Sequence, residues 1–266
     1  MPTIQYPEGE FPTERVQRFN PTTYTNVLRT DEYIVQTARF DPSKGITDVL
    51  TAYEKFHKRY TSLFPDTAPP KLLICGHSSV DDPEGTKVYD SAVAHLEHDT
   101  PQIRPYACVM RIRPSDQMLN ALVSKAKVAL QLSTREGFEV KVSEVLHKGK
   151  PVVATNAGGL PLQVDHGKNG FLVEVGDTDA VAQHLLELFT DKELYNRMSD
   201  YAANSISDDV TTAGNSVDWC YMASKMTKGE VVEPNGRLIN EMVKNETGGH
   251  QQEHRLSRKF DDVDPI

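Results

Sequence analysis

Residues 130–172 read LQLSTREGFEVKVSEVLHKGKPVVATNAGGLPLQVDHGKNGFL and carry the clearest structural pattern in the chain. The apolar run 128–132 predicts a buried strand, and a polar loop at 133–139 follows it. A helical pattern of apolar residues begins at Val140, ends with the cations and glycine of 148–150, and gives way to an apolar strand at 151–155. The order strand, loop, helix, strand predicts a βαβ unit with two parallel strands.

Both loops that leave the carboxyl ends of these strands are suited to ligand binding, because open parallel sheets bind ligands at that edge. Glu136 precedes the helix and Glu144 lies just over two turns later, so both carboxylates can lie toward one side of it. The helix start offers free N–H groups and a positive dipole end, which favour a phosphate. The adjacent Gly158 and Gly159 let backbone approach a ligand closely. Carboxylates for sugar hydroxyls thus stand beside amides for phosphate.

Similar patterns predict the elements on either side of this unit. The other predicted strands are 33–38, 71–75, 108–112 and 171–173. The predicted helices are one that begins near Gly45 with Ser43 as its cap, and then 88–98, 116–126, 177–189, 191–201 and 213–226. A long polar loop is expected at 76–85. Strands that alternate with helices predict a parallel sheet.

Several of these motifs together resemble the donor-binding domain of retaining GT-B glycosyltransferases. They are EGF at 136–138 with Glu144 after seven intervening residues, KPVVAT at 150–155, the Gly158-Gly159 pair and NGFL at 169–172. The strings EGFEVKVSEVLHKGKP at 136–151 and ARFDPSKGI at 38–46 are most similar to fungal trehalose phosphorylases and the related trehalose synthases, over about residues 31–237. The resemblance implies an α/β fold, with a Rossmann-like parallel sheet sandwiched by helices, as the C-terminal half of a GT-B glycosyltransferase.

The resemblance implies catalytic roles for Arg39, Lys44 and Glu136. The two cations would bind the donor phosphate, and a bidentate guanidinium beside a compact ammonium suits a phosphoryl dianion. Glu136 would accept hydrogen bonds from hydroxyls of the transferred glucose. In front-face transfer, the leaving phosphate would assist the incoming oxygen while these cations and the helix N-terminus stabilise the developing charge.

The resemblance also implies a substrate-binding set around the same helix start. Backbone amides of Gly137, Phe138, Glu139 and Val140 would hold sugar and phosphate. Glu144 would contact the ribose of a nucleotide donor, or be structural in a phosphorylase, and two carboxylates at this spacing are, taken alone, more often a solvated face. His77, in the loop after the second strand, would orient phosphate or sugar, although a lone loop histidine is more often structural. We assign no metal, because Asp81 and Asp82 have no third carboxylate at ligand spacing.

Composition narrows the class of protein. A net charge of -9 and a pI near 5.5 argue against a general nucleic-acid or anionic-membrane binder. The three cysteines show neither a disulfide framework nor a metal pattern, and the N-terminus lacks the features of a signal peptide. We therefore expect a cytoplasmic protein without a cofactor. The sequence leaves a homo-oligomer open.

The expected organisation has three parts. Residues 1–30 are proline-interrupted and polar, and read as a flexible extension or a gene-model artefact such as a retained intron. Residues 31–230 form the donor-binding domain, with 213–226 as a helix that crosses back to the acceptor domain. Residues 231–266 form a polar tail, disordered from Thr247. An N-terminal acceptor-binding domain is expected to be missing.

The leading functional prediction is a fragment of trehalose phosphorylase, which converts trehalose and phosphate reversibly to α-glucose 1-phosphate and glucose with retention. A nucleotide-glucose-dependent trehalose synthase is the first alternative. A non-catalytic fragment that binds phosphate or a sugar phosphate is the second. A dinucleotide dehydrogenase is disfavoured, because no GxGxxG follows a strand.

Overall fold

The computed structural model describes residues 32–76, 83–112, 115–206, 210–233, 235–237 and 239–247. The chain divides into two compact units, Met1–Ile206 and Ser207–Ile266. The expectations for residues 1–30, and for disorder beyond Thr247, fall outside the described residues.

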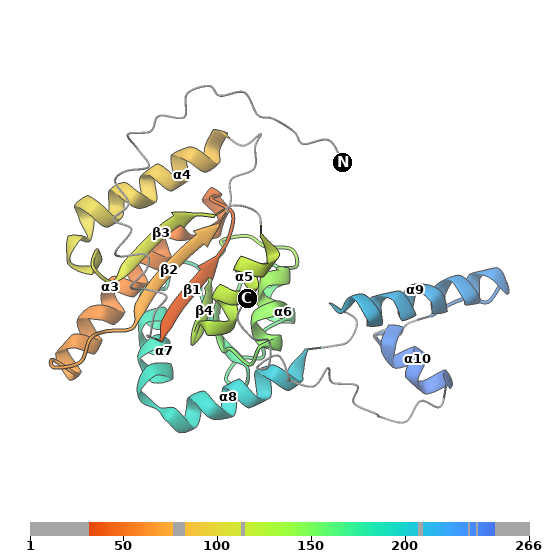
Figure 1. The fold of residues 1–266 in the computed structure, drawn as a ribbon. Helices are drawn as coiled ribbons and strands as arrows, with labels where there is room; N and C mark the ends of the chain where they lie inside the picture. The colour runs from red at the N-terminus through yellow and green to blue at the C-terminus, as the bar shows by residue number, and fades with distance from the viewer. Residues whose placement is uncertain are drawn as a thin grey trace. The chain divides into compact units, whose positions relative to one another are not determined.

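The first unit is built on a parallel sheet of six strands in the order β3-β2-β1-β4-β5-β6. Figure 1 labels the first four strands of this order. The strands are β1 (Tyr33–Thr37), β2 (Lys71–Gly76), β3 (Ala107–Arg111), β4 (Val128–Gln131), β5 (Val152–Thr155) and β6 (Gly170–Val173). Every residue of β1, β4 and β5 is buried, which explains why these strands read as nearly continuous apolar runs. The strands expected from the sequence are all present, with ends that shift by one or two residues.

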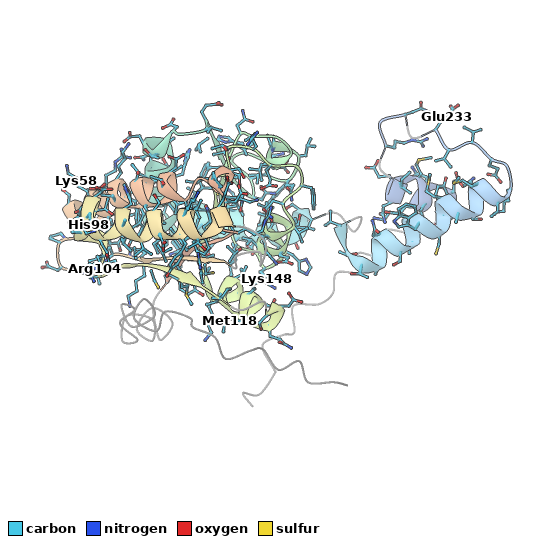
Figure 2. The ribbon with its side chains drawn as sticks, turned by 90° about the horizontal axis from the view of Figure 1, so that it is seen from above. Lys58, His98, Arg104, Met118, Lys148 and Glu233 are labelled. Carbon is cyan, nitrogen blue, oxygen red and sulfur yellow. The ribbon has the colours of Figure 1, made fainter. Side chains whose placement is uncertain are left out.

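Helices cover both faces of the sheet (Figure 1). The helices are α3 (Ile46–Leu63), α4 (Pro83–Ala94), α5 (Asp116–Lys125), α6 (Val140–His147), α7 (Thr178–Thr190) and α8 (Lys192–Ser205). Successive strand residues point to opposite faces, so Ile34 packs in the core under α3, α4 and α7, while Val35 packs in the core under α5 and α6. Helices α3 and α4 lie beside each other, as expected for crossover helices of a parallel sheet, and Figure 2 shows Lys58 of α3 on the same side as His98, which follows the end of α4. The expected α/β sandwich is confirmed.

Strand order reverses between β1 and β4. From β1 the chain builds outward through β2 and β3 on one side, and from β4 it builds outward through β5 and β6 on the other. The loops that leave β1 and β4 therefore diverge to opposite sides and leave a crevice between them, which is where doubly wound sheets bind ligands. The loop after β1 carries Lys44 and the loop after β4 carries Glu136.

Two local predictions are wrong. The sequence placed 76–85 in a loop, but α4 begins at Pro83, because proline at a first helical position loses no needed hydrogen bond. Ser43 does not cap α3. Its backbone N–H and hydroxyl instead donate to Asp41, which caps the short 3₁₀ helix η1 (Pro42–Lys44), and α3 starts after Gly45 without a side-chain cap.

The second unit contains the helices α9 (Thr212–Thr227) and α10 (Ile239–Thr247). Helix α9 confirms the helix expected at 213–226, whereas α10 falls within the segment expected to be a polar tail. On α9, Trp219 is 71% exposed and Tyr221 donates its hydroxyl hydrogen to Glu246 at 2.7 Å. None of the helices in the described ranges is long and apolar enough to cross a lipid bilayer.

Candidate active site

A cleft of about 490 Å³ opens at the carboxyl edge of the sheet. The loops that follow β4, β5 and β6 form its walls, so three consecutive strand ends contribute to one space. Its lining residues are Thr134, Arg135, Glu136, Gly137, Asn156, Ala157, Gly158 and Val175. A second hollow, of about 440 Å³, lies between η1, the start of α3 and α4, and also borders Thr134. The two loops singled out in the sequence, those after β4 and β5, thus line one cleft.

A buried lysine joins the two sides of the crevice. The Nζ of Lys44 donates to Oε2 of Glu136, and also to Oε2 of Glu139 at 3.0 Å. Only 8% of the Lys44 side chain is exposed, against 14% for Glu136 and 15% for Glu139. The ion cluster Lys44–Glu136–Glu139 is therefore largely withdrawn from water, where charge interactions are stronger than on an open surface.

The loop after β1 holds Lys44 at its place. The backbone carbonyl of Lys44 accepts a hydrogen bond from Nε2 of the fully buried Gln36 at 2.8 Å. Gly45 then turns the chain with a φ of 61°, and a Cβ there would meet the carbonyl oxygen of Leu132 at 1.9 Å. Because the two loops touch at this point, only glycine fits, and the approach brings Lys44 against the loop after β4.

Lys44 and its two carboxylate partners stabilise each other's charges. Burial by itself lowers the pKa of Lys44, but hydrogen bonds and charge from Glu136 and Glu139 outweigh it, so the pKa is raised. Burial likewise favours a higher pKa for Glu136, but the hydrogen bond and charge of Lys44, with help from Glu139 and Ser133, bring that pKa below its ordinary value. Lys44 and Glu136 are consequently both charged at neutral pH.

A chain of hydrogen bonds from the ends of β4 and β5 holds the Glu136 carboxylate. Ser133 donates its hydroxyl hydrogen to Oε2 of Glu136 at 3.3 Å, and Gln131 donates to the Ser133 hydroxyl at 2.8 Å. Thr155, at the end of β5, donates to the Ser133 carbonyl. Sequence reasoning assigned no role to Gln131 or Ser133. The signal was a glutamine inside the apolar run 128–132, because a buried amide needs hydrogen-bond partners.

Glu139 is fixed from a different loop. Gln163, just after the short helix η4 (Leu160–Leu162), accepts from the Glu139 N–H at 2.9 Å and donates to the Glu139 carbonyl at 2.9 Å. The same amide donates to Ser143 on α6 at 3.0 Å. The carboxylate of Glu139 caps α6, where its Oε1 accepts from the Lys141 N–H at 3.3 Å. The sequence pattern pointed to the backbone amide of Glu139, but it indicated neither the Glu139 side chain nor Gln163.

The remaining predicted site residues lie as follows. Gly137 lines the cleft, Arg39 is exposed at the end of β1, and Phe138 and Val140 are 53% and 54% exposed. Glu144 is exposed, pairs with Lys141 at 2.8 Å and borders neither cavity. His77 lies outside the described residues. In the described ranges, no three or more His, Cys, Asp or Glu side chains gather to hold a metal ion.

The glycine pair after β5 forms part of the cleft wall. The Gly159 N–H donates to the Glu136 carbonyl at 3.0 Å. A Cβ on Gly158 would meet the Glu136 carbonyl oxygen at 1.7 Å, and one on Gly159 would meet the Gly137 carbonyl oxygen at 1.8 Å. These glycines therefore serve backbone packing against the loop that carries Glu136, in addition to any contact with a ligand.

We expect Gly158→Ala to lower the free energy of unfolding by roughly 2 kcal/mol or more, because alanine combines a strained positive φ with a backbone collision. Gly176→Ala is the matched control, since Gly176 has a φ of 82° but nothing within 4 Å of a new Cβ. Urea unfolding of both variants isolates the collision from the backbone strain. Equal losses of unfolding free energy in the two variants would show that the collision with the Glu136 carbonyl adds nothing to the cost of backbone strain.

Comparisons with a family model and with known proteins agree on a glycosyltransferase family. The family described as glycosyl transferases group 1 matches residues 25–205. The chain is 51% identical to a trehalose phosphorylase from Pleurotus pulmonarius over 223 residues, which cover 82% of this chain and 30% of that protein. It is 33% identical to a trehalose synthase from Thermococcus litoralis over 175 residues, or 66% of this chain and 40% of that protein.

The fold also matches solved structures. A sucrose-phosphate synthase from Thermosynechococcus elongatus superposes with a TM-score of 0.59 and 20% identity, covering 76% of this chain and 49% of that one. The chain spans about 30% of the length of the trehalose phosphorylases that it matches.

Proposed function

Because the chain belongs to the group 1 glycosyl transferases, we propose that it is the donor-binding domain of a trehalose phosphorylase. In the proposed reaction an oxygen of inorganic phosphate forms a bond to an anomeric carbon of trehalose. The bond from that carbon to the bridging oxygen breaks, and the proton of phosphate passes to the departing glucose. The products are α-glucose 1-phosphate and glucose, with retained configuration, and the reaction is reversible.

One observation carries this proposal: a buried lysine and a carboxylate meet at the point where strand order reverses. Lys44 comes from the loop after β1 and Glu136 from the loop after β4, and they form an ion pair beside the cleft. An ammonium suits a phosphoryl group and a carboxylate suits sugar hydroxyls, so the pair matches the two halves of a sugar phosphate.

The residues have separate tasks in this proposal. Glu136 accepts hydrogen bonds from hydroxyls of the glucosyl group, and Ser133 holds its carboxylate in position. Lys44 and Arg39 stabilise the negative charge of the phosphoryl group as the glycosidic bond breaks. The amides of the loop after β4 complete the phosphate contacts, and Gly158 lets the loop after β5 close against that loop. The second glucose is held by a domain outside these 266 residues, and a cytosolic location belongs to the same proposal.

A nucleotide-glucose donor is the competing assignment, since the chain also resembles a trehalose synthase. In that case Glu144 would be available to a ribose, because it is exposed on α6 and its carboxylate pairs with Lys141 at the surface. The two assignments differ in the donor that the domain binds, so binding and turnover can separate them.

The test joins this chain to the N-terminal part of the Pleurotus pulmonarius trehalose phosphorylase and supplies α-glucose 1-phosphate with glucose. Phosphate release by the chimaera, and none by this chain alone, would support the proposal. UDP-glucose as the only productive donor would favour a synthase. A folded chimaera that turns over neither donor would refute a catalytic role, leaving a binding fragment.

Within the active chimaera, Arg39→Ala is expected to lower turnover about 100-fold, the usual loss when one preorganised charge contact is removed. Arg104→Ala is the control, because Arg104 is exposed just before β3 and thus at the amino edge of the sheet, away from the cleft. Initial rates of phosphate release measure both. A loss of less than about threefold in Arg39→Ala would remove this residue from the proposed site.

A further inference from the structure

The carboxylate of Glu139 has no task in the proposed reaction, yet it occupies the groups that attract a phosphate. Its Oε2 accepts from Lys44 Nζ at 3.0 Å, and its Oε1 accepts from the Lys141 N–H in the first turn of α6 at 3.3 Å. An ammonium and a helix N-terminus are both favourable for an anion. The site therefore already holds an anion of its own.

This internal anion is fixed in place. Gln163 holds both the N–H and the carbonyl of Glu139, each at 2.9 Å, and the same side-chain amide reaches Ser143 on α6. Only 15% of the Glu139 side chain is exposed. Because Gln163 holds both polar groups of its backbone and its carboxylate has partners on both oxygens, Glu139 cannot leave the site without breaking several hydrogen bonds.

The charge of the cluster limits what can join it. Two carboxylates surround one ammonium, which leaves an excess of one negative charge at Lys44. A single phosphoryl group can still share Lys44 and approach the exposed Arg39. A second phosphoryl group would add further negative charge, and like charges placed together are strongly unfavourable. It would also need the lysine or the helix N–H that Glu139 occupies.

We propose that Glu139 sets the donor class of this site, admitting a single phosphoryl group, as in phosphate or glucose 1-phosphate, and excluding a nucleoside diphosphate. The proposal rests on the proposed function, since it places the phosphoryl group beside Lys44. It goes further by assigning the choice between the two donor classes to one side chain.

The experiment measures binding of UDP and of glucose 1-phosphate by the whole chain, in wild type and in Glu139→Gln, by calorimetric titration at fixed ionic strength. Glutamine keeps the shape and the capping oxygen but removes the charge. We expect UDP binding to tighten about tenfold or more in Glu139→Gln relative to glucose 1-phosphate. Glu193→Gln removes an exposed carboxylate in the first turn of α8 and should leave both affinities unchanged.

A second variant, Glu139→Gly, removes the whole side chain and is used if Glu139→Gln does not fold; circular dichroism checks folding. An unchanged ratio of the two affinities in the folded variant overturns the proposal, as does a failure to gain any UDP binding. Wild type that binds no glucose 1-phosphate counts against the proposed function instead. A gain of UDP binding in the variant still supports the role of Glu139 in that case.

Discussion

Replacing Glu136 with glutamine in the active chimaera is expected to lower turnover about 100-fold or more. Glutamine keeps the length of the side chain but loses the charge that faces Lys44 and, in the proposed reaction, the glucosyl hydroxyls. The fold should tolerate the change, because Lys44 keeps its ion pair with Glu139. Since the lost interaction is with the reacting sugar, kcat should fall more than the KM for phosphate rises.

Steady-state rates of glucose 1-phosphate formation and urea unfolding, measured on the same preparation, separate catalysis from stability. Glu187→Gln on α7 is the control, because it removes a carboxylate that pairs with His184 away from the cleft. Near-normal kcat in Glu136→Gln would contradict the assigned role. So would a loss of activity matched by loss of folded protein.

Much of the fold was predictable because strands that are buried on both faces of the sheet appear in the sequence as short apolar runs. Runs such as 128–132 and 151–155 are apolar, short and bounded by polar or turn residues, so their strands could be placed to within one or two positions. The misassigned start of α4 shows the limit. Residues 83–87 are mostly polar, and an exposed first turn has no apolar period to reveal it.

The site was predictable only in part, for a different physical reason. Lys44 and Glu136 carried a recognisable motif, and strand order brings their loops together. The bond from Gln163 to Glu139 joins residues 24 positions apart through an irregular loop, and no periodicity reports such a contact. Ser43 was expected to cap α3 because its type favours caps, but its N–H and hydroxyl both donate to Asp41, which caps η1, and α3 has no side-chain cap.

Replacing Lys44 with methionine is expected to have the largest effect on stability. Methionine fills similar space but leaves Glu136 and Glu139 without their shared cation, at 14% and 15% exposure. Removing one partner from a largely buried ion cluster costs on the order of 3 kcal/mol. Binding of glucose 1-phosphate should be lost with it, whereas Lys58→Met on the exposed side of α3 should change neither.

The same substitution should change how stability depends on pH. In wild type the pKa of Glu136 is lowered, so its contribution is fully present above the unfolded carboxyl pKa of about 4.3 and is lost as pH falls through the folded value. In Lys44→Met the cation that lowers the pKa of Glu136 is gone, and the neighbouring Glu139 carboxylate raises that pKa by repulsion. The folded variant then binds protons more readily than its unfolded chain, so acid stabilises it relative to neutral pH.

The free energy of unfolding of Lys44→Met should therefore fall short of the wild-type value by less at about pH 5 than at about pH 7.5, a range above the ordinary glutamate pKa. Urea unfolding of both proteins at the two pH values measures it. An equal deficit at both would mean that Glu136 and Glu139 do not depend on Lys44 as a common counter-ion. It would also count against Glu139 as a fixed anion in the proposed phosphate site, because that proposal requires the two carboxylates to act on one lysine.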